Sequence, residues 1–74
     1  MKLTPNEFHD MQLLLGKTQV GQNLTPQEEM RLRSYIRKEQ PESADDPLDA
    51  IIKVGLVVVG IYLLYKAFQS LSEA

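Results

Sequence analysis

The only histidine of the chain stands between two carboxylates, in the stretch Glu7-Phe8-His9-Asp10. A histidine with acidic neighbours can bind a metal ion or exchange protons with a substrate. On a helix, residues one or two positions apart point to different faces, so these side chains do not converge. We therefore expect a solvated helix face here, with no catalytic or metal site and no cofactor.

The tripeptide Gly16-Lys17-Thr18 has the residue order that ends a phosphate-binding loop. Such a loop requires a glycine five positions earlier, where this chain has Met11, and it follows a strand rather than a helix. The match fails at both points. The sequence thus predicts a non-enzymatic protein without a small-molecule substrate.

The charges of the chain are nearly balanced, with eight Lys and Arg against ten Asp and Glu. Since there is no basic excess to neutralise phosphates, we expect no nucleic-acid partner. A small basic cluster can still touch anionic lipid head groups or an acidic partner; it comprises Arg31, Arg33, Arg37 and Lys38. The chain has no cysteine, which excludes disulfides and thiolate metal sites.

A long apolar run near the C-terminus carries most of the information about location. From Val54 to Tyr65 there is no charged side chain. The stretch from Leu48 to Phe68 has 21 residues, about 31 Å as a helix at ~1.5 Å per residue. A hydrocarbon core is roughly 30 Å thick, and a lone strand cannot satisfy its backbone in lipid. We expect a single transmembrane helix.

The expected contacts with the membrane fall into two groups. Side chains in the hydrocarbon are Leu48, Ile51, Ile52, Val54, Leu56, Val57, Val58, Val59, Ile61, Leu63, Leu64 and Phe68. Interface anchors are Lys53, Tyr62, Tyr65 and Lys66, because long lysines reach back to the interface and tyrosines gather there. The basic residues of the N-terminal part outnumber Lys66 on the other side. This predicts a single-pass protein with a cytoplasmic N-terminal head, or one facing the interior of a virion-associated membrane system.

Two copies of one start signal precede the apolar run. Leu3-Thr4-Pro5-Asn6-Glu7 and Leu24-Thr25-Pro26-Gln27-Glu28 share the pattern Leu-Thr-Pro-x-Glu. Each is typical of a capping box with proline at the first helical position. The first helix should run from Pro5 to Leu15 and stop at Gly16; the second should run from Pro26 to Glu39 and stop before Pro41.

The expected fold class is therefore all-α. Residues 1–40 should form a two-helix hairpin head, 41–46 an acidic linker, 47–71 the transmembrane helix and 72–74 a short tail. A head of about 40 residues without disulfide or metal is usually marginal alone. We thus expect it to bind protein partners through its apolar residues, namely Phe8, Met11, Leu13, Leu15, Met30, Leu32, Tyr35 and Ile36.

One resemblance bears on the class of protein. Ala44-Asp45-Asp46-Pro47, the valine-rich span and Tyr65-Lys66-Ala67-Phe68 together are similar in style to the major coat proteins of filamentous phages. The similarity covers under half of the chain, and the tail lacks the lysine cluster that would face DNA. The resemblance implies a small membrane-spanning virion protein.

Three functions fit these features. The first is a membrane anchor or structural subunit whose head docks on a larger assembly, for example a phage virion protein that links an internal membrane to the capsid. The second is a small membrane-active effector, of holin or toxin type, that self-oligomerises in the bilayer. The third is a membrane-tethered recruiter of a soluble partner. The lipid bilayer is a partner in all three.

Overall fold

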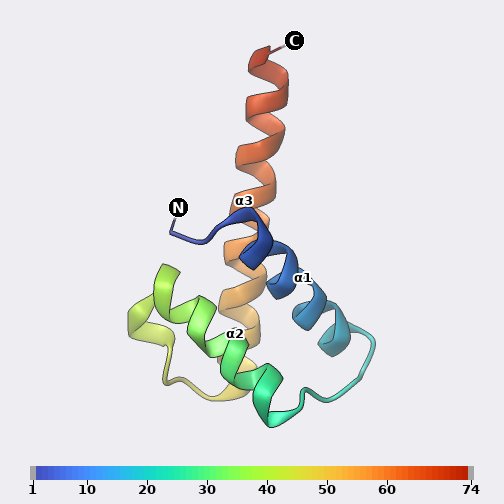
Figure 1. The fold of residues 1–74 in the computed structure, drawn as a ribbon, viewed down its shortest axis with the longest axis vertical. Helices are drawn as coiled ribbons and strands as arrows, with labels where there is room; N and C mark the ends of the chain where they lie inside the picture. The colour runs from blue at the N-terminus through green and yellow to red at the C-terminus, as the bar shows by residue number, and fades with distance from the viewer. Residues whose placement is uncertain (1, 74) are drawn as a thin grey trace.

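The computed structural model describes residues 2–73, and in this range the chain is all-helical, as the sequence predicts. The elements are α1 (Pro5–Gln19), α2 (Pro26–Glu39), a short 3₁₀ helix η1 (Pro41–Ser43) and α3 (Leu48–Glu73). Figure 1 shows α1 and α2 gathered around the first part of α3, while the rest of α3 projects beyond them. The molecule is accordingly elongated, 42 × 27 × 18 Å.

Both predicted capping boxes are present and set the starts of α1 and α2. The Thr4 hydroxyl accepts from the Glu7 N–H at 3.2 Å, and the Glu7 carboxylate accepts from the Thr4 N–H at 2.9 Å. Thr25 and Glu28 repeat the same two bonds at the same distances. The repeated sequence pattern is therefore explained by helix initiation.

The predicted end of the first helix is wrong by one turn, because α1 continues through Gly16 to Gln19. The residue that terminates the helix is Gly21, two positions after Gln19, whose φ of 81° is left-handed. The Gln22 N–H donates to the Lys17 carbonyl at 2.9 Å and the Gly21 N–H to the Thr18 carbonyl at 3.2 Å. These two bonds form a Schellman motif, which requires the left-handed residue that glycine supplies.

The predicted acidic linker is held against α2. It contains η1, and Ala44 is buried. The Arg33 guanidinium donates to the carbonyls of Ala44 at 3.0 Å and Asp46 at 2.7 Å. These bonds fix the path by which the chain leaves α2 and enters α3.

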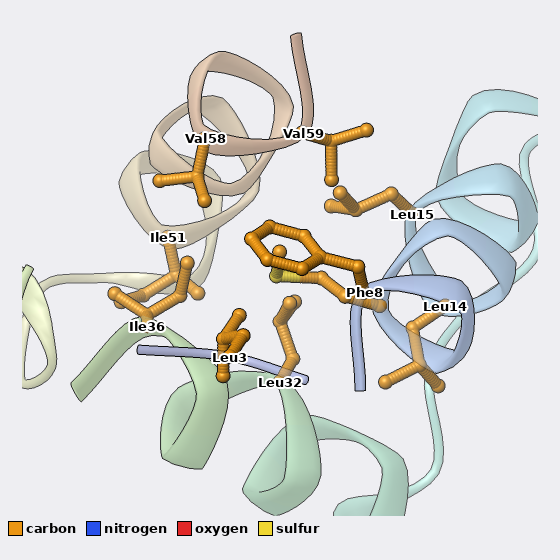
Figure 2. Packing of buried hydrophobic residues seen from close by; sticks show 10 residues of the cluster. Leu3, Phe8, Leu14, Leu15, Leu32, Ile36, Ile51, Val58 and Val59 are labelled. Carbon is orange, nitrogen blue, oxygen red and sulfur yellow. The ribbon is translucent and has the colours of Figure 1, made fainter. Parts of the chain in front are cut away.

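The first half of α3 forms the third side of the head. It packs against both α1 and α2, so the hairpin and α3 share one apolar core (Figure 2). The buried members of that core are Leu3, Phe8, Met11, Leu14, Leu15, Leu32, Ile36, Ile51, Val58 and Val59. Helix α3 also extends past the expected boundary at residue 71: Ser72 and Glu73 are helical, and Ala74 lies outside the described residues.

Candidate membrane-contacting and docking surfaces

Helix α3 lies in two different environments along its length. Ile51 and Gly55 are buried on the face that meets the head, and Val58 and Val59 continue that face. From residue 63 to residue 72 every side chain is exposed. Among the described residues α3 is the one helix long and apolar enough to cross a membrane, and only 22% of its most apolar stretch is buried. A core helix of a water-soluble domain would be mostly buried, and the second half of α3 is not.

Gly55 allows the head to approach α3 closely. A Cβ atom at this position would lie 3.2 Å from Leu15 Cδ2 and 3.6 Å from Ile36 Cδ1. A Cβ at Gly60 would meet nothing within 4 Å. The first glycine is therefore a packing position shared by all three helices, and the second lies beside open space.

An aromatic pair marks the point where the packed half of α3 ends. The rings of Phe8 and Tyr62 stack, with centroids 3.9 Å apart and an interplanar angle of 2°. The Lys66 ammonium reaches back over the Tyr62 ring, 5.5 Å from its centroid. A groove of about 380 Å³ opens here between the start of α1 and α3. The Lys66 side chain thus points back toward the packed half of α3, the usual direction of a long side chain on a helix.

The residues expected in hydrocarbon divide between the two environments. Those buried against the head are Ile51, Val58 and Val59, and those partly covered are Leu48, Ile52 and Val54. The exposed ones are Leu56, Val57, Ile61, Leu63, Leu64 and Phe68. Of the expected anchors, Tyr62 is half-buried, whereas Lys53, Tyr65 and Lys66 are exposed.

Most of the residues expected to bind a partner are occupied within the chain itself. The buried ones are Phe8, Met11, Leu15, Leu32 and Ile36, and Tyr35 is half-buried. In this arrangement they pack in the core that α1 and α2 share with α3, and whether they also bind a partner stays a prediction. Leu13 and Met30 remain on the surface, with 58% and 70% of their areas exposed.

Charged side chains join α1 to α2 along the outside of the hairpin. Lys17 pairs with Glu28 at 2.8 Å, Arg31 with Asp10 at 2.8 Å, and Lys38 with Glu7. The predicted pair of Glu29 and Arg33 within α2 is also present, at 3.1 Å. The three pairs between α1 and α2 link the two helices along a face that is partly exposed to water.

The ion pairs shift the pKa values of the hairpin carboxyls downward. The Lys17 hydrogen bond, helped by the Thr25 N–H, lowers the pKa of Glu28 to about 2. The Lys38 hydrogen bond and the Thr4 N–H lower the pKa of Glu7. Burial raises the pKa of Asp10, but hydrogen bonds from Tyr35 and Arg31 outweigh it, and the net pKa lies below its ordinary value.

The residues around His9 do not come together as a site. Glu7 binds Lys38, and Asp10 binds Arg31 and Tyr35, so both carboxylates are engaged on the side of α2. In the part of the chain that the structure describes, no three metal-ligating side chains of the His, Cys, Asp and Glu types lie close enough to hold a metal ion.

Sequence reasoning missed the Asp10–Arg31–Tyr35 cluster and the packing of α3 on the head. The cluster joins residues 21 and 25 positions apart, and no local pattern marks such a pairing. For α3, Gly55 lies at the close contact, but Gly60 in the same helix contacts nothing, so the glycines alone did not identify the packed face.

Comparisons with protein-family models, curated proteins and solved structures find no match to this chain. The candidate surfaces therefore rest on the geometry described above.

Proposed function

We propose that this chain is a non-enzymatic membrane anchor or structural subunit: α3 attaches it to a lipid bilayer, and its helical head docks on a larger assembly. The observation that carries the proposal is the uncovered second half of α3. Leu64, Phe68 and Leu71 have 64%, 69% and 74% of their areas exposed. Contiguous apolar surface of this kind is unfavourable in water and favourable in hydrocarbon.

The proposed topology places the head in the cytoplasm, or on the interior side of a virion-associated membrane system. It follows from the basic residues of α2, which lie on the head side of the bilayer, whereas the exposed part of α3 carries only Lys66. Leu13 and Met30, exposed on the head, are the contact points that such a location leaves for a protein partner. A link between an internal viral membrane and a capsid is one assembly of this type.

Flotation with phospholipid vesicles tests the attachment. The double variant Leu64→Asp/Phe68→Asp should stay with the soluble fraction, because two carboxylates cannot enter hydrocarbon without a large penalty. The matched control Leu13→Asp/Met30→Asp places the same charges on exposed apolar positions of the head and should float like the parent chain. Equal flotation of both double variants would contradict attachment through α3.

Purification in mild detergent tests the docking role. The proposal predicts a particle of fixed stoichiometry with other proteins, weakened by Leu13→Asp/Met30→Asp while flotation persists. A reversible, substoichiometric and salt-sensitive complex would instead identify a recruiter of a soluble partner.

A second candidate, a membrane-active effector that self-oligomerises, is favoured by Gly60. This glycine lies near the end of the packed half of α3 but faces open space, and it would let a second helix approach closely. Induced expression should then collapse the membrane potential, and Gly60→Leu should prevent the collapse. An intact potential during expression would exclude this function.

A further inference from the structure

The uncovered apolar residues of α3 lie on one side of the helix. Five large side chains recur at intervals of three and four residues, and each is more than half exposed: Val57, Ile61, Leu64, Phe68 and Leu71. Residues at this spacing share one face of a helix. They form the centre of what we call the apolar face of α3, which runs about 21 Å along the axis at ~1.5 Å per residue.

The opposite side of α3 changes character where the head ends. Under the head it carries the buried residues Ile51, Val58 and Val59 and the half-buried Tyr62. Beyond the head it carries Lys66 and Gln69, both exposed. These two line a groove together with residues at the start of α1, so they lie on the side of α3 that the head occupies. The head side of α3 is therefore apolar only where the head covers it.

The apolar face is wider than the contact of a single partner helix. From residue 56 to residue 71, every residue on an arc of about 160°, at 3.6 residues per turn, is apolar. Leu56 and Leu63 lie along one edge of this arc, and Ile61 and Phe68 lie along the other. The seam of a coiled coil uses a narrower stripe. The width thus fits an extended apolar medium, which a bilayer provides.

The position of the polar residues favours contact with lipid on one side only. A helix that crosses a bilayer brings Lys66 and Gln69 to nearly the same depth as Leu64 and Phe68. Among the described side chains, Lys66 forms no ion pair, and a charge without a partner in hydrocarbon is costly. A helix that lies in the interface keeps its polar side among the head groups and its apolar side in hydrocarbon.

We propose that α3 lies along the surface of the bilayer, with its apolar face in the hydrocarbon of one leaflet and the head on the side toward water. The inference rests on the proposed membrane attachment and specifies its geometry. Lys53, which is exposed one turn before Val57 on the same side of α3, then lies at the edge of the apolar face, where its long side chain reaches the lipid phosphates.

Spin labels attached one at a time to the cysteine-free chain in phospholipid vesicles test this geometry. Leu64→Cys is compared with Lys66→Cys, and Phe68→Cys with Gln69→Cys, because the members of each pair lie close along the axis but on different sides of it. These four positions are exposed, so a label leaves the core intact.

Two further labels complete the set. Val57→Cys probes the apolar face where the head still packs on the other side of α3, at a residue that is 61% exposed. Gln22→Cys, exposed in the loop between α1 and α2, is the control for a label that stays in water.

The expected pattern alternates around the helix. Dissolved oxygen should relax the labels at Val57, Leu64 and Phe68 strongly, and a water-soluble nickel complex should not reach them. The nickel complex should relax the labels at Lys66 and Gln69 several-fold more strongly, as it does at Gln22. This pattern follows from a helix with one side in hydrocarbon and the other among head groups.

Two results would overturn the inference while leaving attachment in place. One is equal protection from the nickel complex at Lys66, Gln69, Leu64 and Phe68, which would mean lipid on all sides of a crossing helix. The other is an accessible Val57 with Leu64 and Phe68 protected, since the apolar face would then enter the bilayer only beyond the head. Access of the nickel complex to Leu64 and Phe68 would overturn membrane attachment, and this inference with it.

Discussion

The two halves of α3 have similar apolar side chains and opposite surroundings. Ile51, Val58 and Val59 are covered by the head, whereas Leu63, Leu64 and Phe68 are exposed. The difference comes from the neighbours and not from the helix: Tyr62 still stacks on Phe8 of α1, and the part of α3 beyond the head projects away from α1 and α2 (Figure 1). Hydrophobicity alone indicates that both halves of the helix favour an apolar environment. Which half the protein itself covers depends on where α1 and α2 pack.

The largest contrast is expected between the two phenylalanines. Phe8 is 1% exposed and Phe68 is 69% exposed. Phe8→Ala removes a core ring and should lower the free energy of unfolding of the head by about 3–5 kcal/mol. Phe68→Ala should change it by about 0.5 kcal/mol or less. Urea denaturation followed by circular dichroism measures both changes. Equal changes would contradict the conclusion that the head covers only the first half of α3.

The second largest contrast in stability is expected between substitutions at the two glycines of α3. Gly55→Leu forces a side chain into Leu15 and Ile36, and overpacking of this kind costs about 1–3 kcal/mol. Gly60→Leu meets nothing within 4 Å and gains helix propensity of up to ~1 kcal/mol. Urea denaturation should show that Gly55→Leu lowers the free energy of unfolding and that Gly60→Leu does not. If Gly60→Leu also destabilised the head, the packed region would extend further along α3.

Acid should lower the stability of the α1–α2 hairpin, by less than the substitutions at Phe8 and Gly55. The pKa of Glu28 falls from 4.5 in the unfolded chain to about 2 in the folded one. Its stabilising effect is therefore complete above 4.5 and is lost as the pH falls toward 2. The lowered pKa values of Glu7 and Asp10 act in the same direction.

Thermal unfolding at decreasing pH follows this loss, and Glu28→Gln serves as the control. The variant should be less stable at neutral pH and should show a flatter pH dependence below 4.5. An unchanged pH profile in Glu28→Gln would mean that the pair with Lys17 contributes nothing in solution.

The smallest effect is expected at the boundary of the two halves. Lys66→Gln removes the ammonium over Tyr62, an exposed cation–π contact that contributes about 0.5–1 kcal/mol. Lys53→Gln removes a charge from the outer face of the packed half. If the two variants were equally stable by denaturation, the contact of Lys66 with Tyr62 would carry no energy.

The parts of the fold that could be predicted are those determined by neighbouring residues. Thr4 and Glu7, and likewise Thr25 and Glu28, satisfy each other within one turn, so the helix starts could be read from spacing. The end of α1 was missed because a helix tolerates Gly16 in its interior, and the choice of Gly21 as the terminator depends on two backbone bonds.

The docking of the head on α3 could not be predicted, because the apolar pattern of α3 fits lipid and protein equally well. The pattern marks Ile51 and Phe68 alike as apolar positions of one helix, but it does not say which of them the head covers. Most of the residues expected to bind a partner pack against α3 within the chain, and their binding to another protein stays a prediction.

Spin labels at Leu64, Phe68 and Leu71, placed one at a time in the cysteine-free chain in phospholipid vesicles, test the central claim most directly. If the second half of α3 lies in hydrocarbon, dissolved oxygen should relax all three labels strongly while a water-soluble nickel complex should not reach them. Strong relaxation by the nickel complex at all three positions would place this half of the helix in water and would contradict the account.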